Sequence, residues 1–195
     1  MKRSIILLAC VVGLLLPSLL APAMTVVATY KGRTSVWQVP VTLGGTSYQL
    51  TSPLDLKVGK TTVGQLTELS FGAMSDPFLD LNFHITATAE ADFFFDTGVL
   101  SFDEIINPSA LATAAATLTS DSGGAMLTGK FTGGHAYRAT YNNGVVFADL
   151  IDPFSASANA SATQTDRLPD LGFTTIDGSV NSMRAQWQFH LTAGD

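Results

Sequence analysis

The longest alternation of apolar and polar residues lies in the segment 76–87, D-P-F-L-D-L-N-F-H-I-T-A. Five apolar side chains fall on one side of an extended chain: Leu79, Leu81, Phe83, Ile85 and Ala87. Four polar side chains fall on the other: Asp80, Asn82, His84 and Thr86. This pattern predicts a strand with one face in a core and one in water. Asp76-Pro77 predicts a preceding turn, because the proline ring restricts the backbone.

Similar alternation recurs along the chain between Gly-rich turns. We predict strands over 25–30, 35–41, 48–50, 54–58, 65–71, 93–95, 137–141, 145–151 and 183–191. Pro40 favours an edge position for the second of these, since proline cannot donate to a ladder. Gly44-Gly45 and Asn143-Gly144 predict tight hairpin turns. The segment 109–120 permits a helix through its alanines, but its interleaved threonines favour a strand.

These elements predict an all-β fold, an antiparallel β-sandwich that is jelly-roll-like. Phe93-Phe94-Phe95 predicts a strand buried on both faces, or a bulge. The final strand has Trp187 on its apolar face and runs into Thr192-Ala193-Gly194-Asp195, which has the composition of a new turn. We therefore expect a single domain over 24–195 that lacks its last strand.

The N-terminus has the features of a Sec-type signal peptide over residues 1–23. Lys2 and Arg3 precede an apolar run over 5–16, and Ala21-Pro22-Ala23 supplies a cleavage site between Ala23 and Met24. A retained membrane anchor is one alternative, but it needs about 20 apolar residues and prolines interrupt this run. Lipidation at Cys10 is the other, although the apolar run continues beyond that cysteine.

Composition narrows the chemistry of the mature chain. Cys10 is the only cysteine, so disulfides and Cys-based metal sites are excluded after cleavage. Removal of residues 1–23 leaves 172 residues, enough to form a core without disulfides. It also leaves 8 basic against 16 acidic residues, a net charge of −8. This charge argues against binding nucleic acid or an anionic membrane.

No known catalytic or metal motif occurs in the sequence. His84, His135 and His190 are far apart, and a shared metal site would require neighbouring strands. Four carboxylates near strand ends are candidate calcium ligands: Asp76, Asp80, Asp92 and Asp96. Calcium needs six to eight oxygen ligands, so solvated or turn-forming aspartates are favoured. We predict no catalytic residue, no metal and no cofactor.

Aromatic residues are the remaining candidates for binding, since flat rings can stack on sugars. The candidate glycan contacts are Trp37, Tyr48, Tyr137, Tyr141 and Trp187. Each falls on the apolar face of its predicted strand, where core packing is the favoured interpretation.

Four segments together resemble secreted bacterial PEP-CTERM proteins. The segment 76–83 is similar to their D-P-F-[aliphatic]-x-x-N-F sequence. The segments 137–144 and 147–151 are similar to Y-x-A-x-Y-N-G followed by F-A-x-L-[LI]. The segment 189–195 is similar to the ending F-x-L-T-x-G-D. The order and spacing of these matches, which span about residues 60–195, carry the resemblance.

The resemblance implies an exported all-β domain in a bacterium that produces exopolysaccharide. Such proteins end in a V-P-E-P-like motif, a transmembrane helix and an arginine cluster that an exosortase processes. The sequence here departs from the pattern because no such tail follows Asp195. An exosortase is therefore a partner only if a C-terminal tail exists, and the resemblance transfers no catalytic residues.

The sequence thus predicts a secreted or cell-surface protein of the extracellular matrix that is not an enzyme. The alternative is a carbohydrate-binding module for exopolysaccharide, in which case extracellular polysaccharide is the partner. Neither nucleic acid nor, after signal cleavage, a membrane is an expected partner.

Overall fold

The computed structural model describes residues 24–39, 47–74 and 77–192. Several sequence features lie outside these residues: the predicted signal peptide with Cys10, Pro40, Gly44-Gly45, Asp76 and the segment 193–195. Within the described part, no helix is long and apolar enough to cross a membrane.

The described chain folds almost wholly into strands, which confirms the predicted all-β class. The first eight are β1 Met24–Tyr30, β2 Arg33–Val39, β3 Ser47–Gln49, β4 Leu54–Val58, β5 Thr61–Met74, β6 Phe78–Ala87, β7 Ala91–Asp96 and β8 Leu100–Ile106. The next five are β9 Ser109–Ala110, β10 Ala112–Ser120, β11 Ala125–Gly129, β12 Tyr137–Tyr141 and β13 Val145–Leu150. The last four are β14 Phe154–Ala156, β15 Ala160–Leu168, β16 Thr174–Thr175 and β17 Ser179–Leu191, and a short 3-10 turn, η1, covers Thr132–Gly134.

The back layer is an antiparallel sheet in the order β13-β12-β17-β7-β1-β2. Its central strand β17 has 13 residues, and this length lets it also pair with β8 and β11 at its two ends. Strand β2 lies at the edge of the sheet, as predicted for the second strand from Pro40 within the segment 35–41.

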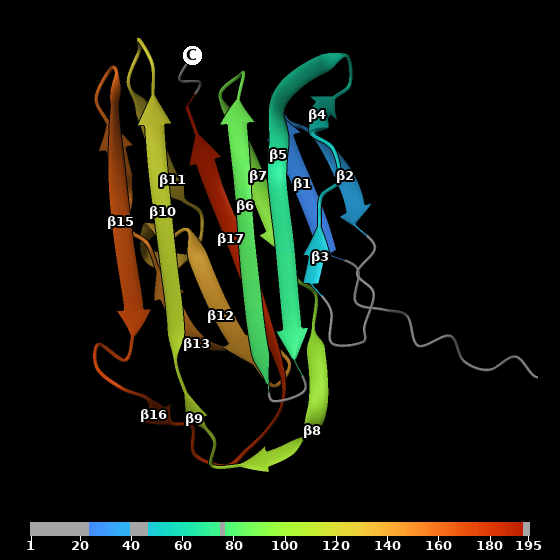
Figure 1. Cartoon of the computed structure of the whole chain (residues 1–195), viewed down its shortest axis with the longest axis vertical. Coiled ribbons are helices and arrows are strands. Elements are labelled where there is room, and N and C mark those ends of the chain that lie inside the picture. Colours follow the sequence, from blue (N-terminus) through green and yellow to red (C-terminus); the bar gives the residue numbers. More distant parts are fainter. Residues whose placement is uncertain (1–23, 40–46, 75–76, 193–195) are drawn as a thin grey trace, which may run out of the picture.

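The front layer consists of two separate antiparallel ladders. In the first, β5 pairs with β6 along one edge and with β3 and β4 along the other. In the second, β10 pairs with β15. Figure 1 shows β15, β10, β6 and β5 side by side in this layer, with β17 of the back layer visible between β10 and β6. The two layers match a β-sandwich, whereas the structure does not establish the jelly-roll order.

A cluster of aromatic rings joins the two layers. The ring of Phe83, on β6, stacks on that of Phe95, on β7, with centroids 4.0 Å apart. Phe189 and Trp187, both on β17, lie 6.1 Å and 5.7 Å from the same Phe83 ring. Burial of such large apolar side chains is the main force that holds one sheet against the other.

Strand β6 confirms the alternation predicted for 78–87, but its inner face is covered incompletely. Its apolar side chains, including Leu81, Phe83 and Ile85, are only half-buried, while Asn82 and His84 on the other face are exposed. The partial exposure arises because β6 has a hydrogen-bonded neighbour on one side only.

The three consecutive phenylalanines form a regular strand without a bulge. Phe93 and Phe95 point into the core, whereas Phe94 is half-buried on the outer face of β7. The ladders to β1 and β17 run without a register shift. The strand therefore contains no bulge and is fully buried on one face only. Its neighbours in the sheet cover part of Phe94 on the other face.

The Asn-Gly hairpin and the strand predicted over 109–120 are both present in the structure. Strands β12 and β13 are joined by a three-residue turn in which Asn142, Asn143 and Gly144 all have positive φ. That turn is one residue longer than the two-residue form expected for Asn143-Gly144. The alanine- and threonine-rich segment 109–120 forms β9 and β10 rather than a helix.

Candidate functional site

The most distinctive feature of the surface is an opening between β6 and β10. Each of these strands is hydrogen-bonded on one side, and no ladder joins them to each other within the described residues. A cavity of about 470 Å³ lies between them, bounded by residues 81–87 of β6 and 115–119 of β10. We call this cavity the slot.

The two walls of the slot differ in side-chain size. On the β6 side the inward residues are large, among them Leu81, Phe83 and Ile85. On the β10 side the inward residues are mostly small, with Ala116 beside the longer Leu118. This difference follows from the sequences of the two strands, since the inward positions of β10 are mostly alanine whereas those of β6 are mostly large apolar residues.

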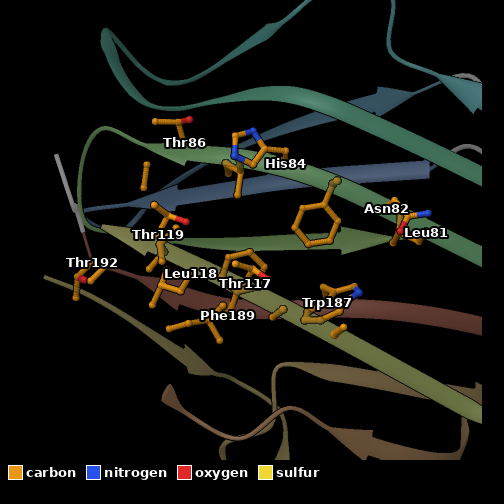
Figure 2. A pocket seen from close by; sticks show the side chains of 18 of the residues that line it. Leu81, Asn82, His84, Thr86, Thr117, Leu118, Thr119, Trp187, Phe189 and Thr192 are labelled. Atoms are coloured by element: carbon orange, nitrogen blue, oxygen red, sulfur yellow. The ribbon is translucent and has the colours of Figure 1, made fainter. Parts of the chain in front are cut away.

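The floor of the slot belongs to the back layer. Trp187 and Phe189 of β17 line it (Figure 2). Leu191 of the same strand and Leu127 of β11 line the cavity as well. Trp187 is only 6% exposed, and its ring meets Phe83 edge-on. The slot therefore has an apolar floor and opens through the front layer onto the core of the sandwich.

Polar residues form the rim of the slot rather than its interior (Figure 2). The Thr117 hydroxyl lies 3.0 Å from that of Thr163 on β15. On the opposite wall, the His84 imidazole is hydrogen-bonded to Thr67 on β5. These polar groups bond to strands away from the slot and do not converge on its centre.

A second cavity, of about 400 Å³, lies between the other ends of the same two strands. Its lining includes six aromatic residues: Phe78, Phe102, Tyr137, Tyr141, Phe147 and Phe173. Two of them reach the surface, since Phe173 is 68% and Phe78 49% exposed. We call this the lower cavity, because it lies toward the β8 and β9 end of the molecule in Figure 1.

The structure brings three of the five candidate glycan residues near one another. Tyr137 and Trp187 are in edge-to-face contact at 5.4 Å, and Tyr141 lines the lower cavity with Tyr137. Trp37 packs half-buried against the core from the edge strand β2, and Tyr48 lies on β3 opposite Phe71. The five residues therefore do not gather into one surface.

Burial limits what two of these rings can contact. Trp187 lies in the floor of the slot, and Tyr137 is shielded from solvent so that burial raises its pKa to about 12. Their positions match the core packing that the alternation favoured. Tyr141 is half-buried beside the lower cavity.

The histidines lie in different parts of the molecule. His84 is on the front layer, His190 is on β17 of the back layer, and His135 lies 3.1 Å from the Asp152 carboxylate after η1. His190 bridges two acidic residues, with Nδ1 2.8 Å from Asp92 and Nε2 3.0 Å from Glu90. Among the described residues, no group of three or more His, Cys, Asp and Glu side chains is arranged to hold a metal ion.

Three of the four candidate calcium-binding aspartates have other partners in the structure. Asp80 accepts a hydrogen bond from the Asn82 amide at 2.9 Å, and Asp92 pairs with Lys130 at 3.1 Å. Asp96 is buried and forms a two-point ion pair with the Arg184 guanidinium. Asp76 lies outside the described residues.

Asp92 gives a pH-dependent contribution to stability. Partial burial acts to raise its pKa, but hydrogen bonds from His190 and Lys130 outweigh burial and leave the pKa below its ordinary value of 3.8. A carboxyl with a lowered folded-state pKa stabilises the fold above that ordinary value and loses the contribution as pH falls through the folded one. We expect Asp92→Asn to lower the free energy of unfolding at pH 6, by an amount that shrinks below pH 3.8.

Chemical denaturation at a series of pH values checks this expectation. Glu104→Gln, at an exposed position on β8, is the matched control and should have little effect at either pH. A pH-independent effect of Asp92→Asn would show that the carboxylate has no electrostatic role there.

Sequence reasoning identified β6 but missed the slot. Alternation reports which side chains of a strand face a core, whereas the slot depends on which strands become neighbours. The sequences of β6 and β10 are separated by three further strands, β7 to β9. No local signal in the sequence shows that these two edges remain unpaired.

Comparison with protein-family models finds no match for this chain, and comparisons with curated proteins and with solved structures likewise find none. The resemblance to PEP-CTERM proteins therefore stays a prediction from the sequence.

Proposed function

We propose that this protein is an exported, non-enzymatic protein of the cell surface or extracellular matrix of an exopolysaccharide-producing bacterium, and that it acts through binding. The observation that carries this proposal is the kind of side chain that lines the slot and the lower cavity. The slot and the lower cavity are lined largely by aliphatic, aromatic and hydroxyl side chains. Such linings suit binding better than acid–base or nucleophilic chemistry.

The distribution of charged groups supports the same proposal. Arg138 and Asp149 form a two-point ion pair at 2.7 Å and 2.8 Å between β12 and β13. Arg184 is similarly occupied by Asp96, and this contact raises the pKa of its guanidinium. These groups stabilise the sheet by pairing with each other and leave little of their hydrogen-bonding capacity for a substrate.

Enzymatic activity can be tested with the purified chain and chromogenic glycosides and esters. The proposal expects no turnover above that of a heat-denatured sample. Turnover that disappears in a His84→Ala or Asp121→Ala variant, at the two ionisable side chains in the slot lining, would overturn the non-enzymatic role.

Export makes a separate prediction at the N-terminus. Strand β1 begins at Met24, the first residue after the predicted cleavage site, and the Met24 side chain is fully buried. We expect the full chain expressed in a bacterium with Sec export to be recovered outside the cytoplasm with Met24 at its N-terminus. Intact-mass and N-terminal peptide measurements check this.

Ala23→Arg should prevent that cleavage, because the site requires a small residue, and the longer precursor should accumulate. Ser18→Thr, outside the cleavage site, is the matched control and should be processed normally. An unprocessed wild-type chain would contradict export through a cleavable signal.

Binding of a polysaccharide is the second candidate role, and the lower cavity is the observation that favours it. Tyr141 is half-buried there and Phe173 is exposed, so a sugar ring could stack from the open side. Retention on immobilised exopolysaccharide that is lost in Tyr141→Ala and Phe173→Ala, but kept in Val36→Ala on the edge strand β2, would support this role. Equal retention in all variants would exclude the cavity as the binding site.

A further inference from the structure

The slot has the geometry of a sheet from which one strand is missing. Strands β6 and β10 run in the same direction in Figure 1, while their outer neighbours β5 and β15 run the opposite way. A strand between β6 and β10 that ran opposite to both would therefore complete one antiparallel sheet. Such a strand would lie about 4.8 Å from each neighbour and could bond to both.

The edges of the slot carry backbone groups that such a strand would satisfy. Each strand edge without a ladder presents amide and carbonyl groups that have no partner in the sheet. The free edges of β6 and β10 face each other across the slot. One strand would pair both edges at once, whereas a bound small molecule would pair only a few of these groups.

The side chains define the chemistry of that strand. Its inward residues would meet Trp187, Phe189 and Leu191 on the floor, and these require apolar partners. The small Ala116 on β10 leaves room for a larger inward side chain from the incoming strand. Its outward residues would join the threonine-rich rim, where polar residues are suited to water.

The C-terminal end of β17 lies at the mouth of the slot. Strand β17 ends at Leu191, and the next residue, Thr192, lines the slot together with Ala87 and Thr119 from the ends of β6 and β10. Two hydrogen bonds hold Thr192 there, one from its amide to the Met126 carbonyl at 3.1 Å and one from the Met126 amide to its hydroxyl at 2.8 Å. A polypeptide that turned back at this point would run opposite to both β6 and β10.

We propose that one further β-strand occupies the slot between β6 and β10, and that the polypeptide leaving β17 at Thr192 supplies this strand. In the sequence, residues 193–195 follow Thr192, and Gly194-Asp195 has the composition of a turn. A second copy is a poorer occupant. Every strand in the described part already belongs to a ladder, so a copy would have to break its own sheet to insert a strand with two free edges.

The test extends the full chain after Asp195 by nine residues of alternating threonine and valine. The matched control carries the same segment with two of its threonines replaced by proline, which cannot donate to a ladder. Amide hydrogen exchange of β6 and β10 is measured by NMR on the chain with and without each extension. The proposal expects exchange at edge amides of both strands to slow at least about tenfold with the alternating segment only.

Ala116→Arg tests the location of the added strand. In the chain that ends at Asp195, the arginine can extend through the open slot to water, so its melting temperature should stay close to that of the unsubstituted chain. In the extended chain, the Ala116→Arg substitution should return the amide exchange of β6 and β10 to the rate of the chain without the extension. The proposal is overturned if the alternating segment protects neither strand, or if Ala116→Arg leaves the protection intact.

Two further outcomes would also overturn it. If the chain ending at Asp195 is dimeric by light scattering and already protected along both edges, a second copy occupies the slot. If only a separately added threonine-valine peptide, and not the joined segment, gives protection, the strand is supplied by another polypeptide.

Discussion

Replacing Gly129 by alanine should destabilise the fold by roughly 3 kcal/mol or more, the largest effect that we expect from adding one methyl group. The added Cβ would lie 2.0 Å from the His135 carbonyl carbon and 2.3 Å from the Ala136 nitrogen. Both are backbone atoms, so no side-chain rotation can relieve the clash.

The surrounding backbone is held firmly in place. Phe131 donates to the His135 carbonyl at 3.0 Å, and Ala136 donates to the Ile151 carbonyl at 2.9 Å. Relief of the clash at Gly129 would therefore break hydrogen bonds on the back sheet. Urea denaturation measures the loss of stability.

Gly72 on β5 provides a matched glycine in a strand. Its Cβ would meet the Asp80 side chain at an ordinary 3.7 Å, so Gly72→Ala should change stability by less than about 1 kcal/mol. Equal effects at the two positions would show that the close approach at Gly129 is absent in solution.

Phe95→Ala should destabilise the protein by about 3–5 kcal/mol, because it removes a fully buried ring from the centre of the aromatic cluster. Phe83→Ala removes a ring of the same size from the same cluster, yet it should have a clearly smaller effect. Phe83 is already half-buried at the wall of the slot, so less apolar surface returns to water when the protein unfolds.

The comparison of these two variants is more informative than either value alone. Thermal and urea denaturation of both, under identical conditions, gives the difference directly. A loss at Phe83 equal to that at Phe95 would indicate that the slot is closed over Phe83 in solution.

The sequence predicts the fold class because side-chain alternation is a local property. In β6 the pattern places Phe83 inward and His84 outward, as observed. The Asn143-Gly144 hairpin is equally local, since its turn depends on residues that tolerate positive φ. Both features require only near neighbours in the chain.

The extent of β5 illustrates where sequence reasoning fails. The sequence predicted a strand over 65–71, whereas β5 runs over Thr61–Met74 and includes Gly64 and Gly72. Glycine weakens a strand prediction, but at Gly64 the fold requires the absence of a side chain. A Cβ there would lie 2.8 Å from the Thr86 carbonyl oxygen on β6. That requirement arises from tertiary packing and has no local signal.

The slot was unpredictable for a related reason. Its walls, β6 and β10, are each ordinary amphipathic strands, and its floor is the apolar face of β17 that the sequence assigned to the core. The opening exists because neither wall strand pairs with the other, which is a property of the whole topology.

Backbone proton contacts measured by NMR test the open front layer most directly. We expect cross-strand contacts between β5 and β6, at pairs such as Leu69 with Phe83, and between β10 and β15, at pairs such as Ala116 with Gln164. The same spectra should contain no ladder of backbone contacts between β6 and β10. A continuous ladder between these two strands would show that the sheet is closed and that the slot does not exist.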